Sequence, residues 1–163
     1  MKKTRFITKT AAIAGLYIVL TVLNAGFSSG PVQCRLSEAL CILPVFTAAA
    51  VPGVTIGCLV SNIIVGGAVW DIVFGSLATL IGAVGTYLLR KHKFFAFLPP
   101  IAANTVIVPF ILSFVYKFPG SLWWFAFTVF AGEAVSCGGF GAILFAAVNK
   151  NKALKKFLSG KEK

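Results

Sequence analysis

The sequence predicts an all-α membrane protein, built as a compact bundle of six transmembrane helices. Three observations lead to this prediction: 58% of the 163 residues are apolar, only 12% are charged, and the charged residues stand in clusters between long uncharged stretches. A soluble domain has about half its residues apolar and about a quarter charged. A basic nucleic-acid-binding protein would spread its charge over a polar surface. The composition therefore excludes a soluble enzyme, a nucleic-acid-binding domain, a disordered tail and a disulfide-stapled secreted domain.

The segment boundaries follow from the positions of Gly, Pro and charged residues, because a spanning helix needs about 20 apolar residues between such breaks. Six helices are predicted, followed by a basic tail, within one transmembrane domain: residues 7–27, 36–50, 54–65, 72–89, 100–116 and 122–148, with the tail at 149–163. The second and third are short for spans. A four-span arrangement, with these two segments as a re-entrant hairpin, therefore stays open.

The basic residues predict the orientation, since cytoplasmic loops of membrane proteins are enriched in Lys and Arg. With six spans and a cytoplasmic amino terminus, thirteen of the fifteen basic residues fall on the cytoplasmic side, and Arg35 and Lys117 are the two exceptions. We therefore expect a multi-pass protein of the cell membrane with both termini in the cytoplasm. The basic start resembles a signal peptide, but Lys9 interrupts the apolar run and a small-residue cleavage site is missing, so a retained helix is expected.

Three carboxylates interrupt the apolar segments: Glu38, Asp71 and Glu133. Ionisable residues at membrane depth are costly and point to function. The predicted topology places all three in the outer half of the bundle with Asn62 and Trp70, while Asn104 lies in the inner half. The pattern predicts an outward-opening polar pocket. Acidic and amide groups beside aromatic rings suit a flat, donor-rich or cationic ligand.

Each of these residues also has a structural interpretation. Arg35 and Glu38, spaced i,i+3, could pair across one helix turn, and Asp71 could cap the helix that it begins. Trp70 could contact ligand or belong to an interfacial belt, which is favoured for Trp123 and Trp124. Asn62 and Asn104 could join helices by hydrogen bonds. Glu133 has neither a cap position nor a basic neighbour in sequence, which favours function.

The remaining chemistry-bearing residues give no further prediction. The four cysteines, Cys34, Cys41, Cys58 and Cys137, show no metal-ligand spacing, and buried cysteine usually behaves as a small apolar residue. No metal and no cofactor are expected. No phosphate-binding loop is present, so the chain is expected not to hydrolyse ATP.

Particular motifs in this chain resemble the QueT family, over nearly the whole sequence. They are Arg35-Leu36-Ser37-Glu38-Ala39-Leu40, Pro44, Pro52-Gly53, Asn62, Asp71 to Thr79 and Ala131-Gly132-Glu133-Ala134. QueT proteins are substrate-binding S components of energy-coupling factor (ECF) transporters for queuosine precursors. The resemblance implies the six-helix S-component fold, with a ligand pocket near the extracellular face.

The ligand implied by the resemblance is a 7-deazaguanine base, such as queuine or 7-aminomethyl-7-deazaguanine. Its guanine-type edge would be held by Glu133 or Glu38, and its aminomethyl group would lie near Asp71. Trp70 or a phenylalanine would stack on the base. Amide contacts would come from Asn62 and Asn104, and Arg35 completes the predicted binding set.

The resemblance also implies partners, namely a transmembrane coupling subunit and two cytosolic ATPases. In this superfamily an Ala-x-x-x-Ala motif on the first helix meets the coupling subunit. Here Ala11, Ala14 and Gly15 form a small-residue patch, and Gly15 takes the second motif position. Packing inside the bundle is the alternative for this patch. The basic tail is predicted to lie on anionic membrane lipid.

Three other functions compete with this interpretation. An autonomous secondary transporter would usually show internal repeats, and no convincing repeat is present. An intramembrane enzyme would need a nucleophile and base at membrane depth, whereas the single His92 lies in a predicted cytoplasmic loop. An S component for another vitamin or nucleobase stays open, because a fold does not fix a substrate.

Overall fold

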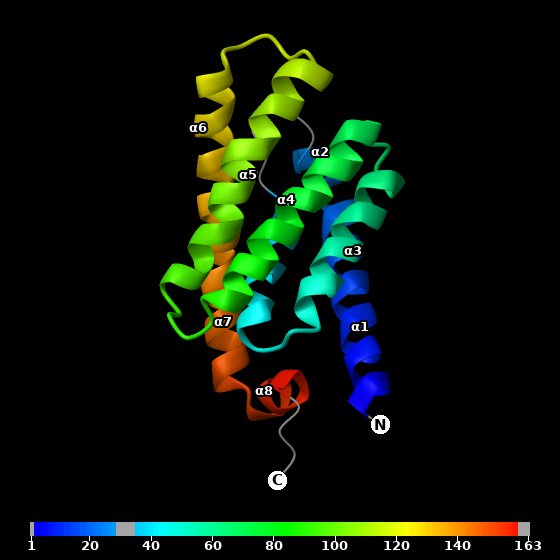
Figure 1. The fold of residues 1–163 in the computed structure, drawn as a ribbon, viewed down its shortest axis with the longest axis vertical. Coiled ribbons are helices and arrows are strands. Elements are labelled where there is room, and N and C mark those ends of the chain that lie inside the picture. The colour runs from blue at the N-terminus through cyan, green and yellow to red at the C-terminus, as the bar shows by residue number, and fades with distance from the viewer. Residues whose placement is uncertain (1, 29–34, 160–163) are drawn as a thin grey trace.

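The computed structural model describes residues 2–28 and 35–159. Every regular element in these ranges is a helix, which confirms the all-α prediction. Four helical stretches are long and apolar enough to cross a membrane: Lys3–Leu23, Val69–Leu88, Phe95–Val115 and Leu122–Lys150. The elements run alternately up and down the long axis of the molecule (Figure 1).

The first helix, α1 (Lys2–Leu23), packs along α3 (Ala50–Ile64). Glycines on α3 allow this close approach, since a Cβ at Gly57 would lie only 2.7 Å from Cβ of Tyr17. The predicted first helix, residues 7–27, differs from α1 at both ends, since α1 begins at Lys2 and ends at Leu23. The structure has α1 ending at Leu23 and a separate short α2 (Ala25–Ser28) after a turn at Asn24.

The third element, η1 (Leu36–Val45), is a 3-10 helix whose residues 37–44 are all buried. A 3-10 helix of this length is uncommon, and η1 is too short to be a candidate span. The prediction of one helix over 36–50 was wrong, because α3 already begins at Ala50 and contains Pro52 in its first turn. Proline is tolerated there, since the first-turn N–H groups have no intrahelical partner.

Two long helices follow. The helix α4 (Val69–Leu88) leads through η2 (Phe95–Phe97) into α5 (Leu98–Phe110), which continues as a π-helical turn, η3 (Ile111–Val115). The C-terminal half of α4 packs closely against the first turn of α5, where a Cβ at Gly82 would lie 2.6 Å from Cα of Pro100. Pro109 lies within α5 just before η3. Because proline has no backbone N–H, one hydrogen bond of the α-helix is missing at this position.

The last stretch, Leu122–Lys150, is helical throughout. It comprises α6 (Leu122–Glu133), the π-helical η4 (Ala134–Phe140) and α7 (Gly141–Lys150). Ser121 caps α6 by accepting a hydrogen bond from the Trp124 N–H at 3.2 Å. Glu133 thus stands at the junction of α6 and η4, and π-helical turns are frequent at functional sites.

The last described element is a short helix, α8 (Lys152–Ser159), which lies beside the start of α1 at one end of the molecule (Figure 1). Lys9 of α1 donates a hydrogen bond to the Leu158 carbonyl at 3.0 Å. The loop between α4 and η2, which carries Arg90, Lys91 and Lys93, lies toward the same end (Figure 1). The clustered basic residues of the described chain are therefore gathered at one end of the bundle.

Candidate functional site

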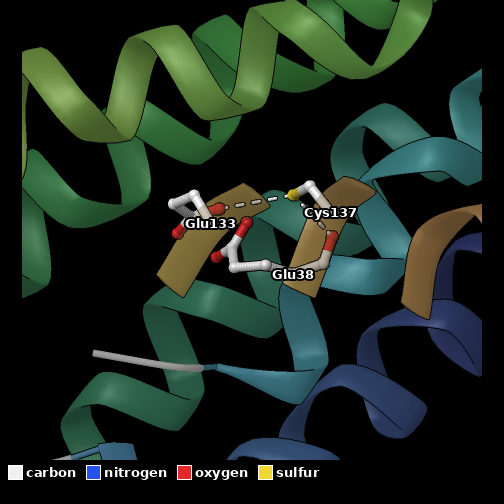
Figure 2. Close-up of side chains that lie close together, drawn as sticks. All are labelled: Glu38, Glu133 and Cys137. Atoms are coloured by element: carbon white, nitrogen blue, oxygen red, sulfur yellow. Dashed lines mark hydrogen bonds between the residues drawn. The ribbon is translucent and has the colours of Figure 1, made fainter. Parts of the chain in front are cut away.

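Two buried carboxylates meet inside the bundle, one from η1 and one from the end of α6. Figure 2 shows Glu38 and Glu133 with the thiol of Cys137 between their segments. Side-chain atoms of these three residues lie within 4.8 Å of one another. Glu38 is only 1% exposed and Glu133 6%. We call these three residues the carboxylate cluster.

Each carboxylate is held by hydrogen bonds from other helices. Glu38 accepts from the Tyr17 hydroxyl of α1 and, through Oε2, from Sγ of Cys41 at 3.0 Å. Glu133 Oε1 accepts from Nδ2 of Asn104 in α5 at 3.0 Å. Among the described residues, neither carboxylate forms a salt bridge with a Lys or Arg side chain. The cluster therefore concentrates negative charge or a bound proton in the protein interior, and would favour a cationic or donor-rich ligand.

A second polar group lies at the start of α4. Nη2 of Arg35 is 3.8 Å from Oδ2 of Asp71, and the Tyr116 hydroxyl donates to the same oxygen at 3.0 Å. The Tyr116 oxygen in turn accepts from the Ala68 N–H at 3.1 Å. Burial, together with the neighbouring Asp71 carboxylate, raises the pKa of Tyr116, so its phenol stays protonated.

This arrangement decides two interpretations left open by the sequence. Arg35 pairs with Asp71 rather than across one turn with Glu38. Burial opposes the charge of Arg35, but the negative groups around it, Asp71 foremost, outweigh burial and raise its pKa. Asp71 makes no cap: α4 has Ala68 at its N-cap position without a side-chain cap hydrogen bond.

One face of α4 connects the two polar groups. Asp71, Gly75 and Thr79 follow at intervals of one helical turn and are all buried. Thr79 Oγ1 lies 3.5 Å from Oε1 of Glu38. At the other end, a Cβ on Gly75 would lie 3.2 Å from Oδ1 of Asp71 and 3.3 Å from Nδ2 of Asn62. Five of the seven predicted binding residues thus fall into the two polar groups, and Asn62 lies beside Gly75 between them.

The seventh, Trp70, is placed elsewhere. Its side chain is 60% exposed and stacks on Phe74, with ring centroids 5.9 Å apart. It lines an apolar cavity of about 590 Å³ with Phe74 and side chains of α5 and η3. The structure does not bring Trp70 to the carboxylate cluster.

Comparison with known proteins gives a consistent result. Residues 7–150 match the family described as QueT transporter. The chain belongs to the QueT transporter family. It is similar to the queuosine precursor transporter QueT of Lactococcus lactis subsp. cremoris (strain MG1363), with 32% identity over 140 residues that cover 75% of this chain and 80% of that protein. No solved structure gives a significant match.

Membership of a transporter family confirms the prediction of a membrane transport protein and places the QueT-family chain outside the enzymes. The motifs around Glu38, Asp71 and Glu133, which carry the resemblance to this family in the sequence, all lie within the matched residues 7–150. The polar groups described above are therefore the candidate substrate-binding groups of a QueT transporter.

The three residues of the predicted docking patch of the QueT-family chain differ in burial. Ala11 and Gly15 are exposed, and a Cβ on Gly15 would meet no atom within 4 Å. Ala14 is buried, and its carbonyl oxygen would lie 3.1 Å from a Cβ on Gly57 of α3. Ala14 therefore packs inside the bundle, whereas Ala11 and Gly15 leave an open small-residue surface.

Several site residues of the QueT-family chain were missed from the sequence. Tyr17 and Tyr116 carry no local signal, since their partners lie 21 and 45 residues away in the chain. Cys137 does carry a local sequence signal, because it stands four residues after Glu133 and side chains at i and i+4 share a helix face. Its Sγ lies 3.3 Å from Oε2 of Glu133 and 3.2 Å from the Glu38 carbonyl oxygen (Figure 2).

The carboxylate cluster also has the donor types of a metal site, with two carboxylates and one thiol. In the structure, however, both carboxylates and the thiol already take part in hydrogen bonds. Metal binding would require deprotonating the thiol and breaking these contacts. Cys34 lies outside the described residues.

Proposed function

We propose that this chain is the substrate-binding S component of an ECF importer in the cell membrane, which captures a 7-deazaguanine queuosine precursor. Membership of the QueT transporter family and the name of the Lactococcus lactis relative support the substrate class. The gathering of basic residues at one end of the bundle supports a cytoplasmic position for both termini. In this proposal six helical segments form the bundle in the membrane, with η1 and α3 as short segments tucked inside it.

One observation carries the proposal: the buried Asn104–Glu133 pair beside a second carboxylate. A guanine-type edge presents a carbonyl oxygen next to two N–H donors. A carboxylate can accept two parallel N–H bonds. An amide nitrogen has two N–H donors, so Asn104 can keep its bond to Glu133 and donate a second one to the ligand carbonyl. Glu133 and Asn104 together therefore match a guanine-type edge in both donors and acceptors.

The aminomethyl group of the ligand would lie toward Asp71, at the opposite end of the α4 face. Eight residues separate Asp71 from Thr79, which corresponds to about 12 Å along a helix. This spacing is on the scale of a bicyclic base with a short substituent. Gly75 adds no side chain of its own to this face, where Asp71 Oδ1 and Asn62 Nδ2 approach within 3.3 Å of the place that a Cβ would take, and Asn62 would supply an amide contact. Trp70 is not part of this binding set.

Energy for uptake would come from partners, a transmembrane coupling subunit and two cytosolic ATPases. The exposed Ala11 and Gly15 on α1 support a docking surface, because small residues at i,i+4 let helices approach closely. The chain alone would bind substrate without accumulating it. An autonomous secondary transporter would instead accumulate substrate after reconstitution without ATPases.

The test is ligand binding by the purified full chain in lipid nanodiscs. Queuine and 7-aminomethyl-7-deazaguanine are titrated by calorimetry against guanine and thiamine. We expect saturable binding of the 7-deazaguanines, at least tenfold weaker binding of guanine, and none of thiamine. In Glu133→Gln, binding of the 7-deazaguanines should fall at least tenfold, since hydrogen bonds to a charged group contribute about 1.5–3 kcal/mol each.

The matched control is Glu162→Gln, the same chemical change in the basic tail outside the described residues, which should bind as the unaltered chain does. Binding of thiamine in place of the 7-deazaguanines would contradict the substrate class. Equal binding by Glu133→Gln and the unaltered chain would contradict the assigned site.

A further inference from the structure

A basic cleft opens between the first turns of α1 and the helix α8, far from the carboxylate cluster. Its volume is about 420 Å³. Three cationic side chains, two threonines and an aromatic ring form most of its lining: Arg5, Lys9, Lys156, Thr4, Thr8 and Phe157. No carboxylate is among the described residues that line it.

The cleft is held in shape by contacts between its two walls. Lys9 donates to the Leu158 carbonyl at 3.0 Å, and its ammonium lies 5.7 Å from the centroid of the Phe157 ring. Leu158 is buried, at 4% exposure, and so anchors α8 to the bundle. At its beginning, α8 is capped by Asn151 Oδ1, which accepts from the Leu154 N–H at 3.1 Å. The charges on the two walls are therefore positioned by folded structure rather than by a tail in solution.

Both helices that form the cleft also carry exposed apolar side chains, and Phe157 among them lines the cleft itself. Phe6 and Ile7 of α1 and Leu154 and Phe157 of α8 are all exposed large apolar residues. Residues 3–23 form a candidate span that starts at this cleft. Cations flanked by exposed apolar side chains at the start of a span are suited to a ligand with a phosphate and an apolar body.

We propose that this cleft binds the phosphate of an anionic membrane phospholipid, with Arg5, Lys9 and Lys156 around the phosphate and an acyl chain along the exposed ring of Phe157. Bound lipid would then tie α8 to α1 at the membrane surface. This site is separate from the proposed substrate site. Its test can therefore fail while the transport proposal stands, and the reverse also holds.

The test is native mass spectrometry of the full chain, titrated with phosphatidylglycerol or with phosphatidylcholine of the same acyl chains. Lys156→Gln removes a charge that lines the cleft. Lys155→Gln is the matched control, because Lys155 is the neighbouring residue, does not line the cleft, and reaches Asn149 instead. We expect one phosphatidylglycerol to bind preferentially, with affinity about fivefold lower in Lys156→Gln and unchanged in Lys155→Gln.

Three results would overturn the proposal. Equal binding of the two lipids would remove the role of the anionic headgroup. Equal losses in the two variants would show general charge attraction without a site. Inorganic phosphate binding as tightly as phosphatidylglycerol would show a site for free phosphate rather than for lipid. The circular dichroism spectrum and the substrate affinity of Lys156→Gln are both expected to be unchanged. These two controls distinguish a specific loss of lipid binding from misfolding of the variant.

Discussion

Asn104 of α5 donates a hydrogen bond to Glu133 of α6, with Nδ2 and Oε1 3.0 Å apart in the buried interior. The two residues are 29 positions apart in sequence and are brought together by the antiparallel packing of these helices. An amide that donates to a buried carboxylate fixes the direction of both groups. In the proposed function, the pair would present a carboxylate and an N–H side by side to the ligand.

Replacing Asn104 should change the ligand preference. In Asn104→Leu the N–H proposed to meet the ligand carbonyl is lost, so 7-deazaguanine should bind about tenfold more weakly, corresponding to ~1.4 kcal/mol. The analogue without the carbonyl oxygen, 2-amino-7-deazapurine, should bind the variant and the unaltered chain about equally. Calorimetric titration of both ligands checks this. Asn149→Leu, on the last turn of α7, is the control, and equal losses for the two ligands would contradict the role of Asn104.

The contributions of Arg35 and Asp71 to the free energy of unfolding should be coupled. Either Arg35→Gln or Asp71→Asn alone leaves a partly buried charge without its partner, whereas the double variant removes both charges. We expect the double variant to be less destabilised than the sum of the single variants, by about 0.5–3 kcal/mol. Thermal unfolding in a mild detergent measures the cycle. Additive losses would show that the 3.8 Å approach contributes nothing to stability.

Two glycines offer a matched test of the α1–α3 contact. In Gly57→Ala the new Cβ would stand 2.7 Å from Cβ of Tyr17, which forces the helices apart and should cost about 1–3 kcal/mol. In Gly15→Ala the new Cβ meets no atom within 4 Å, so the melting temperature should not fall. Because Tyr17 also donates to Glu38, Gly57→Ala should weaken ligand binding as well. Equal melting temperatures for the two variants would contradict the close packing.

The exposed surface on α1 can be tested by steric blocking. Ala11→Trp should leave ligand binding intact and abolish uptake in cells, because the indole would keep a partner helix from approaching. Ile143→Trp is the control, since Ile143 is exposed on α7 and lies outside the small-residue surface. Uptake is followed with a radiolabelled queuosine precursor in cells that carry the partner subunits. Undiminished uptake by Ala11→Trp would remove α1 as the docking surface.

Local sequence patterns predicted a large part of this molecule. Apolar runs between charged clusters predicted an all-helical membrane protein, because each such run must satisfy its backbone hydrogen bonds internally. The cost of a buried charge marked Glu38, Asp71 and Glu133 as functional candidates. These three residues are now found buried inside the bundle.

Pairing between distant residues was not predictable in this way. From sequence, Arg35 could pair with Glu38, three residues away, or contact a ligand, whereas in the structure it pairs with Asp71 of α4. Trp70 stands next to Asp71 in sequence, but neighbouring helical residues point in directions about 100° apart, and its ring stacks on Phe74 instead. The boundary between η1 and α3 was misplaced because Pro52 signals a break locally while the first turn of a helix accepts it.

The sequence by itself determined that the chain is helical, resides in a membrane and carries three costly carboxylates, because these properties depend on composition and on residues close together along the chain. The tertiary structure decided which carboxylates meet, through Tyr17, Asn104 and Cys137, and which predicted residues turn away, as Ala14 and Trp70 do. The reason is physical: a buried polar group takes whichever partner the helix packing places within hydrogen-bond distance.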